Sequence, residues 1–270
     1  EQLPDVFVER VGITTKHAAD GWTADISANI RNLADEDASA DVTLTLAGQT
    51  FTQTAHIPAD STAIIRIPDA HYADVTAWTP DTPALYDLRA EIREGNQVLD
   101  DLIDRVGFRE ISISGTDILL NGKKLRLMGF NRHEEYGAFG CAVPLQAMAQ
   151  DILMMKDMGC NCVRTCHYPN DPRFLDLCDE MGLLVWEEAH ARGLQEEQMR
   201  NPNFMPQTRQ CVREMVAQHR NHPSIFIWGC LNECADNCDY GADCYREVYA
   251  LLHDLDASRP MTAALLERPG

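Results

Sequence analysis

"SIFIWGCLNE", from Ser224 to Glu233, is the stretch of this sequence that says most about its fold. Its apolar run, Ile225 to Trp228, leads almost directly into the polar pair Asn232 and Glu233. A short apolar run of this length is typical of a strand buried on both faces. The stretch therefore predicts a buried strand that delivers two polar side chains to an open edge of a sheet.

Helical and strand patterns alternate on both sides of this stretch. Apolar residues at 145, 148, 149, 152 and 155 form a helical stripe behind Pro144, a residue suited to a first helical turn. Further elements are predicted in chain order: strand "NCVRTCHYP", helix "DPRFLDLCDEMG", strand "LLVWEE", a helix over 205–219, a helix over 245–256 and strand "MTAAL". Repeated βα units imply a parallel sheet, either doubly wound or barrel-like.

The first 108 residues have a different period. "DVTLTLAG" and "STAIIRIP" have strand-like patterns, and "ALYDLRAEIREGNQVLDD" predicts a hairpin that turns at Gly95 and Asn96. Several short strands at regular spacing favour an immunoglobulin-like β-sandwich over residues 1–109, with Trp22, Trp78 and Tyr86 in its aromatic core. Residues 110–270 then form the second domain, which begins with the hairpin "DILLNGKKLRLMGFNRHE" turning at 121–122.

The composition limits the classes of partner that the protein can have. A net charge of -19 argues against nucleic acid or an anionic membrane as the main partner. No apolar run approaches the roughly 20 residues that a membrane span needs, and no signal-peptide pattern is present. The chain starts at Glu1 without Met, so a processed or excised chain is also considered.

All ten cysteines lie between Cys141 and Cys244. A disulfide framework would not usually avoid half of a chain, so we predict reduced, packed thiols in a cytoplasmic protein, with a secreted or periplasmic protein as the alternative. The cysteine clusters lack the paired C-x-x-C spacing of a structural zinc site, although an unrelated Cys/His metalloprotein is an open alternative.

Polar side chains follow four successive predicted strands, whose bodies are apolar. In a barrel, chemistry is found where strands end and βα loops begin. Four strand ends carrying carboxylate, imidazole or guanidinium groups together predict one shared active-site rim. In chain order these side chains are His133 and Glu134; Arg164, His167 and Tyr168; Glu187, Glu188 and His190; Asn232 and Glu233.

These strand ends resemble glycoside hydrolase family 2, the group of β-galactosidase, β-glucuronidase and β-mannosidase. Four segments carry the resemblance in the family's order: "AWTPDTPALYDL", "VGFREISISGTDILLNGKKLRLMGFNRHE", "NCVRTCHYPNDPRFLDLCDEMGLLVWEE" and "NHPSIFIWGCLNE". The resemblance implies an immunoglobulin-like β-sandwich followed by an incomplete TIM (β/α)8-type barrel of about five βα units. It also implies a retaining exo-β-glycosidase with a carbohydrate substrate.

The resemblance also implies roles for single residues. Glu233 would be the general acid/base, with its apolar flank raising the pKa of the carboxyl group. Asn232 would bond the sugar 2-hydroxyl, and Arg164 would hold the nucleophilic carboxylate ionised. His133 and His167 would donate to hydroxyl groups of the sugar. The alternatives are a loop cap for Asn232 and structural hydrogen bonds for the histidines.

The resemblance to family 2 suggests magnesium as a candidate metal ion. β-Galactosidases of the family bind it after the third strand through a carboxylate and, two residues later, a histidine. Here the segment reads "WEEAHARGL"; Glu188 matches the carboxylate-bearing strand end, but His190 falls at another spacing. We therefore predict no cofactor, with magnesium as the weaker alternative.

The predicted barrel is incomplete. A full barrel has eight strands in about 250 residues, and we predict five strands after Arg109. The family's nucleophile lies on the seventh strand, and Glu267 is not predicted to replace it, so the chain alone is expected to be inactive. We predict β-galactosidase as the parent activity. The alternatives are β-glucuronidase, β-mannosidase or a non-catalytic sugar-binding or assembly fragment, with homo-oligomerisation or completion by missing domains also possible.

Overall fold

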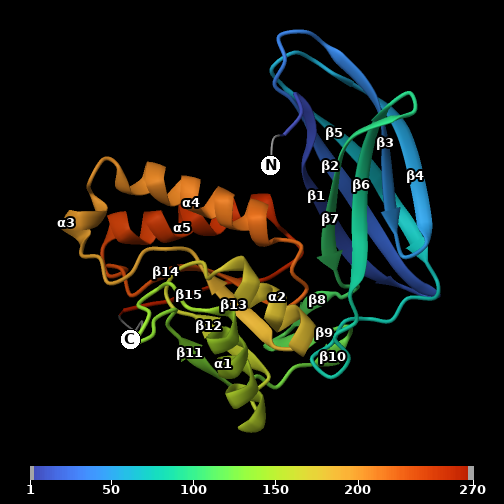
Figure 1. Ribbon diagram of the computed structural model, residues 1–270. Coiled ribbons are helices and arrows are strands. Elements are labelled where there is room, and N and C mark those ends of the chain that lie inside the picture. Colours follow the sequence, from blue (N-terminus) through green and yellow to red (C-terminus); the bar gives the residue numbers. More distant parts are fainter. Residues whose placement is uncertain (1–2, 267–270) are drawn as a thin grey trace. The chain divides into compact units, whose positions relative to one another are not determined.

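Two compact units make up the computed structural model, which describes residues 3–266 (Figure 1). The first unit extends to Trp78 and resumes over Ala84–Arg109. The second unit contains Thr79–Pro83 and the chain from Glu110 onward. Each unit buries its own cluster of apolar side chains, so each has a core of its own.

The first unit is a β-sandwich, as the sequence predicted. Its antiparallel sheets have the strand orders β1-β2-β5 and β4-β3-β6-β7. The strands are β1 (Val6–Ala18), β2 (Gly21–Asn32), β3 (Ala38–Leu46), β4 (Gln49–Ile57), β5 (Thr62–Tyr72), β6 (Tyr86–Glu94) and β7 (Gln97–Val106). Buried and more exposed positions alternate along β2, β3 and β6, because successive side chains of a strand point to opposite faces. The buried sets of both sheets form one core.

Phe108 is the centre of the aromatic core in this unit. Its ring lies 5.0 Å from that of Tyr72, 5.4 Å from that of Tyr86 and 6.4 Å from that of Trp22, measured between centroids. The backbone N–H of Trp78 donates to the carbonyl of Phe108. The three predicted aromatic residues therefore belong to this core or its edge, but the residue that joins them was not anticipated.

The second unit is built on a parallel sheet with the strand order β11-β12-β13-β14-β15. The strands are β11 (Gly129–Arg132), β12 (Cys162–Thr165), β13 (Leu184–Glu188), β14 (Ile225–Asn232) and β15 (Met261–Ala264). Each strand pairs in parallel with the next strand along the chain. A doubly wound sheet reverses its strand order at a switch point, so this order is that of a barrel wall.

Helices connect these strands. They are α1 (Leu145–Asp157), α2 (Pro172–Met181), α3 (Glu196–Met199), α4 (Phe204–His219) and α5 (Asp239–Leu255). Four of the five match predicted helices, and Gly182 ends α2 in the left-handed conformation, as predicted. α5 begins at Asp239 rather than at Tyr245, because the Cys238 sulfur accepts from the backbone of Gly241 and caps the earlier turn. The short α3 was not predicted.

A β-hairpin extension opens the second unit, in the order β10-β9-β8. It contains β8 (Ile111–Ser114), β9 (Asp117–Leu120) and β10 (Lys123–Lys124). Asn121 and Gly122 have φ values of 52° and 74°, which confirms the predicted turn. The second arm was predicted to continue to the first polar strand end, which is wrong: it is two residues long, and β11 joins the parallel sheet instead.

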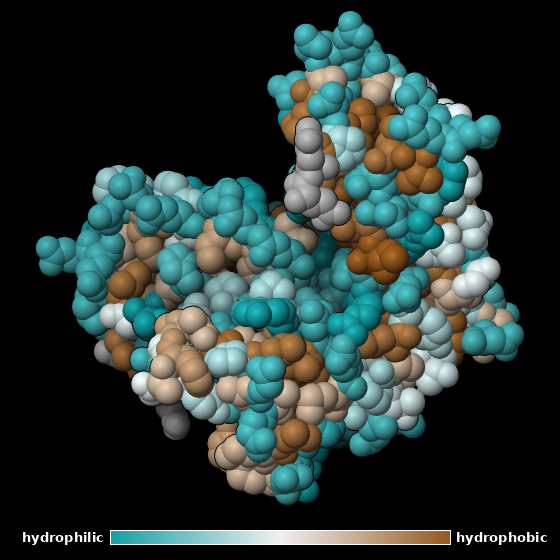
Figure 2. Space-filling view, in the orientation of Figure 1, coloured by the Kyte–Doolittle hydropathy of each residue, from teal (hydrophilic) through white to brown (hydrophobic). Residues whose placement is uncertain are grey.

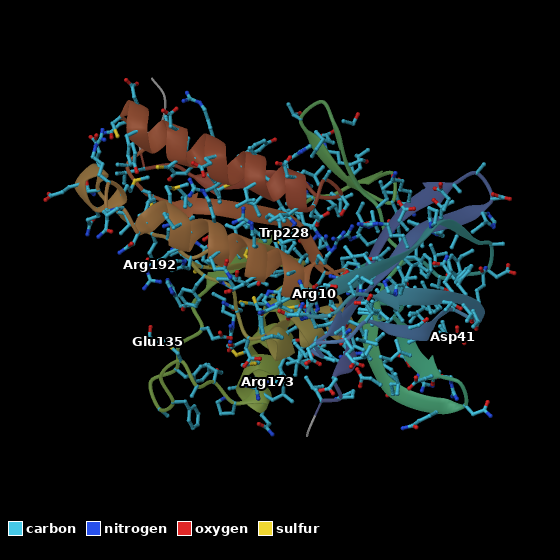
Figure 3. All side chains as sticks on the ribbon, turned by 90° about the horizontal axis from the view of Figure 1, so that it is seen from above. Arg10, Asp41, Glu135, Arg173, Arg192 and Trp228 are labelled. Atoms are coloured by element: carbon cyan, nitrogen blue, oxygen red, sulfur yellow. The ribbon has the colours of Figure 1, made fainter. Side chains whose placement is uncertain are left out.

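β14 is the most enclosed strand of the second unit. All eight of its residues are buried, and Trp228, Cys230 and Leu231 belong to the apolar core. Trp228 is labelled in Figure 3. All ten cysteines are free thiols, as predicted. Hydrophilic side chains cover much of α4 and α5 in Figure 2. In the part of the chain that the structure describes, no helix is both long and apolar enough to cross a membrane.

Asp179 on α2 anchors the start of β14. Its carboxylate accepts from Nδ1 of His222 at 2.6 Å and from the backbone N–H of Ser224 at 2.9 Å. Burial lowers the pKa of His222, but the charge and hydrogen bond of Asp179 more than offset this effect, so the pKa lies above its ordinary value of 6.5. The charged imidazole therefore stabilises the fold below that value, and the contribution is lost as the pH rises through the raised pKa.

We expect His222→Gln to lower the free energy of unfolding by about 2 kcal/mol near pH 5.5, because it removes a buried charge-assisted hydrogen bond. The deficit should shrink toward pH 9, because the wild-type imidazole loses its charge as the pH rises through its raised pKa. Urea unfolding at both pH values measures it, with His253→Gln on the exposed face of α5 as the control. An equal deficit at both pH values would contradict the role of the charge.

Candidate active site

The carboxyl ends of the parallel strands bring the predicted polar side chains to one edge of the sheet. His133 follows β11, and Arg164 lies near the end of β12. Glu188 ends β13 and Asn232 ends β14, with Glu233 directly after it. Because neighbouring strands run in parallel, their ends meet, and side chains far apart in the sequence come within hydrogen-bond distance. The polar strand ends therefore meet at one edge of the sheet, where hydrogen bonds join Arg164, Glu188 and Asn232.

Glu188, Arg164 and Asn232 form a continuous chain of hydrogen bonds across three strands. Nε of Arg164 donates to Oε1 of Glu188 at 2.6 Å, and its Nη2 donates to Oδ1 of Asn232 at 2.6 Å. The Glu188 side chain is only 3% exposed, so its charge depends on this partner. Arg164 also lies over the Trp186 ring, with the guanidinium carbon 4.7 Å from the ring centroid.

Two imidazoles extend this network toward solvent. Nδ1 of His167 lies 2.8 Å from Oε2 of Glu188, so both oxygens of that carboxylate are engaged. The ring of His133 packs edge-on against that of His167 at 5.4 Å and is exposed. The Tyr168 hydroxyl lies 3.5 Å from Nδ1 of His133. The histidines thus stand together at the rim, one half-buried and one exposed.

Glu233 differs from its expected surroundings. It is exposed and has a φ of 48°, which is uncommon for a residue with a side chain and often marks a functional turn. Its N–H donates to the carbonyl of Ala264 at 2.8 Å, which fixes the turn beside β15. The apolar flank predicted around the carboxylate was wrong, because Trp228, Cys230 and Leu231 point into the core instead.

The hydrogen-bond partners of Arg164 and Asn232 also differ from those that the sequence predicted. Arg164 was expected to hold the nucleophile, but the carboxylate it holds is Glu188. Oδ1 of Asn232 is taken by Arg164, so its amide nitrogen is the part of the side chain left to donate to another molecule. This arrangement disfavours the loop-cap alternative for Asn232.

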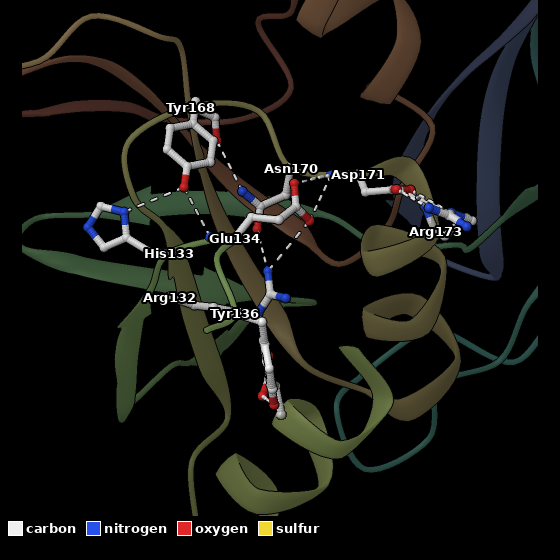
Figure 4. Close-up of polar contacts among 9 residues, drawn as sticks. Arg132, His133, Glu134, Tyr136, Tyr168, Asn170, Asp171 and Arg173 are labelled. Atoms are coloured by element: carbon white, nitrogen blue, oxygen red, sulfur yellow. Dashed lines mark hydrogen bonds and ion pairs between the residues drawn. The ribbon is translucent and has the colours of Figure 1, made fainter. Parts of the chain in front are cut away.

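A second network supports the loop after β11 (Figure 4). The buried Arg132 donates to Asp151 and to Asn170, both at 2.9 Å. The Glu134 carboxylate accepts from the backbone N–H of Asp171, and its own N–H donates to the Tyr168 hydroxyl. Burial is the main cause that raises the pKa of Glu134. These contacts hold Glu134 in a structural position, with His133 beside it at the rim.

A cavity of about 410 Å³ adjoins the rim. It is bounded by His167 and Tyr168 from the loop after β12, by the segment after β13 that includes His190 and Arg192, and by the first turns of α4. Arg192 lies beside Asn232 in an isolated parallel bridge, and its guanidinium carbon is 5.4 Å from the centroid of the Tyr168 ring. Arg192 was not predicted, because it follows β13 in an irregular segment without a periodic pattern.

Comparison with known families identifies the family of both units. Residues 111–265 match the family model described as "Glycosyl hydrolases family 2, TIM barrel domain". Residues 6–109 match the family model described as "Glycosyl hydrolases family 2". The chain belongs to glycosyl hydrolase family 2. The resemblance seen in the strand ends is thereby confirmed, as is a β-sandwich followed by part of a TIM barrel.

Two solved structures match nearly all of the chain. A β-galacturonidase from Eisenbergiella tayi, solved with galacturonate, is 44% identical to this chain with a TM-score of 0.95. The match covers 98% of this chain and 47% of the β-galacturonidase. β-Glucuronidase 2 from Bacteroides uniformis is 27% identical with a TM-score of 0.87, over 97% of this chain and 35% of that one.

A curated relative extends this comparison. A β-galactosidase from Thermoanaerobacter pseudethanolicus is 36% identical over 186 residues, which are 68% of this chain and 24% of the relative. This chain therefore spans from about a quarter to about half of the length of these family 2 proteins.

Glu188 does not fit the magnesium role that family 2 suggests. Magnesium prefers oxygen ligands in octahedral geometry. Both oxygens of Glu188 are engaged by Arg164 and His167, and a guanidinium beside them opposes a second cation. His190 is exposed and lines the adjoining cavity instead.

We expect Arg164→Gln to lower the free energy of unfolding by about 3 kcal/mol, because it leaves the Glu188 carboxylate buried without its cation. The double variant Arg164→Gln/Glu188→Gln should recover much of this loss, since neither charge then remains. Chemical denaturation of the single and double variants measures the coupling, with Arg213→Gln on the exposed face of α4 as the control. Additive effects of the two substitutions would contradict the buried pair.

Proposed function

We propose that the chain forms part of a retaining exo-β-glycosidase in which Glu233 is the general acid/base. The observation that carries this proposal is the place of Glu233, at the end of a fully buried barrel strand and next to the Asn232–Arg164–Glu188 chain of hydrogen bonds. Cleavage of a glycosidic bond needs a proton donor at the leaving oxygen. An exposed carboxyl group on a fixed turn can reach such an oxygen.

Asn232 would orient the sugar in this mechanism. Because Arg164 occupies Oδ1, the amide nitrogen of Asn232 is presented as a donor. A hydroxyl group of the sugar that accepts this hydrogen bond would be held at a fixed distance from Glu233, the next residue. Such contacts add to catalysis where they strengthen in the transition state.

His133 and His167 would bind further hydroxyl groups. Glu188 holds Nδ1 of His167, which leaves Nε2 for the substrate and fixes the orientation of the ring. His133 is exposed beside it and is free to contact a bound sugar. Both rings thus belong to the proposed sugar pocket.

The retaining mechanism also needs a nucleophilic carboxylate. Glu188 is a poor candidate, since both of its oxygens are already engaged. By resemblance to the family the nucleophile belongs to the seventh barrel strand, and the structure describes five strands of the barrel. Glu267, for which no catalytic role is predicted, lies outside the described residues. Hydrolysis is therefore proposed for a polypeptide with all eight strands, and little or none for this chain alone.

A β-galactoside is the first candidate substrate. It is supported by the relatives named β-galactosidase and β-galacturonidase, whose substrates share the galactose configuration. Carbohydrate is the only partner that this proposal requires.

We expect Glu233→Gln, in a polypeptide with the complete barrel, to lower kcat/KM by about 10²–10⁴-fold on aryl β-galactosides. The loss should be smaller for good leaving groups, because their departure needs less protonation. Steady-state rates over a series of aryl leaving groups test this, with β-glucuronides and β-mannosides in parallel. The control is Glu214→Gln on the exposed face of α4, whose carboxylate accepts a hydrogen bond from Gln210. Robust turnover that survives Glu233→Gln on all substrates would rule out the assignment.

An acidic sugar is the second candidate, and Arg192 favours it. This exposed guanidinium lines the cavity beside Asn232 and lies over the Tyr168 ring. Arginine binds carboxylates through two parallel hydrogen bonds, so it could select a β-galacturonide or β-glucuronide over the neutral sugar. The relatives named β-galacturonidase and β-glucuronidase support this alternative.

We expect Arg192→Gln to reduce kcat/KM for aryl β-uronides by about 10–100-fold, because one charge-assisted pair is lost, and to change β-galactoside hydrolysis little. Arg192→Lys should recover only part of the loss, since an ammonium group lacks the forked geometry. The ratio of kcat/KM for the two sugars is the measurement. Equal losses on both substrates would show that Arg192 does not select the carboxylate.

A further inference from the structure

We propose that His133, Cys166 and His167 form a binding site for zinc or another soft divalent metal ion. Each of the three residues offers one ligand atom, and these atoms all lie within 4.8 Å of one another. The ligands come from the loops after two neighbouring strands, β11 and β12, at the same rim as the proposed sugar pocket.

The donor set favours zinc over magnesium or calcium. Two imidazoles and a thiolate are borderline or soft ligands, which suit zinc and copper, whereas magnesium and calcium prefer oxygen ligands. Zinc–nitrogen bonds of about 2.0 Å and zinc–sulfur bonds of about 2.3 Å place tetrahedral ligands about 3.5 Å apart. Ligand atoms that lie within 4.8 Å of one another are therefore at most about 1 Å farther apart than in a formed tetrahedral site.

The surroundings of His167 resemble those of a metal-binding histidine. Ligating histidines commonly donate their second ring nitrogen to a carboxylate, which fixes the ring and makes the other nitrogen a better ligand. Glu188 holds Nδ1 of His167 at 2.8 Å, and Glu188 is itself held by Arg164. The charge of Arg164 opposes a metal ion, but the Glu188 carboxylate and the cysteine thiolate together offset it.

The three ligands leave a coordination position open. Cys166 is 1% exposed and lies at the base, whereas His133 is exposed. Zinc sites with three protein ligands keep a fourth position for water or another molecule. Because the same two imidazoles are proposed to bind sugar hydroxyl groups, metal and sugar would compete for this position, and bound metal would inhibit hydrolysis.

One other cluster in the described part of the chain has a similar ligand spacing but is less suited. It consists of Asp176, Asp179 and His222. Asp179 already accepts from Nδ1 of His222 and from the backbone of Ser224, so its oxygens serve the fold. His133, Cys166 and His167 are not tied together in this way.

Cobalt(II) titration of the 270-residue chain tests the proposal without relying on hydrolysis. We expect tetrahedral d–d absorption and a thiolate-to-cobalt charge-transfer band, both removed by added zinc. Cys166→Ser and Cys166→Ala should lose the charge-transfer band, and each should weaken zinc binding at least about tenfold. Circular dichroism and thermal unfolding would establish that these variants fold.

Matched variants separate this site from the other thiols. Cys238→Ser should keep the full cobalt spectrum, because Cys238 caps α5 and serine is a good cap. Glu188→Gln should keep the charge-transfer band but weaken zinc binding by about 10–100-fold, since Glu188 only orients His167.

Three outcomes would overturn the proposal. One is the absence of a cobalt charge-transfer band in the wild-type chain. Another is a band that persists in both folded Cys166 variants. The third is a band that disappears with Cys141→Ser instead, which would place the metal on the exposed thiol. None of these outcomes bears on Glu233, so the proposed glycosidase function is tested separately.

Discussion

The buried carboxylate of Glu188 is the constraint on which the site depends. A charge that is 3% exposed must be paired, and the partners are Arg164 on β12 and His167 in the loop after it. A second nitrogen of Arg164, Nη2, donates to Asn232 at the end of β14. One electrostatic requirement therefore fixes the orientation of three side chains at the rim and leaves the amide of Asn232 and the far side of His167 for a ligand.

β14 combines the demands of stability and function in one strand. Its body is buried at every position, and its start is tied to α2 through Asp179, Ser224 and His222. Its last residue is held by Arg164, and the chain then turns through Glu233 in a left-handed conformation. Because β14 is buried along its length, it holds the exposed carboxyl group of Glu233 in a fixed position, as a mobile loop would not.

The rim offers more than one kind of chemistry. Imidazoles that can donate to hydroxyl groups can also bind a soft metal ion, and Cys166 lies close enough to complete a three-ligand set. Arg192 adds a cation at the cavity beside Asn232. Sugar recognition, selection of acidic sugars and metal inhibition would then all act through a few strand ends, which is expected where parallel strands converge.

The sequence by itself determined the order and type of most elements. Period-2 and period-3.6 patterns, the turns at Gly95 and Gly122 and the helix end at Gly182 are local signals, and they were sufficient for the sandwich, the barrel strands and the polar strand ends. Only the tertiary structure decided the partners: Arg164 with Glu188, the exposure of Glu233, the place of Arg192, and His133 beside Cys166. The physical reason is that periodicity reports which face of an element is buried. Pairing across strands depends instead on register and on the choice of partner for each buried charge, which no local pattern contains.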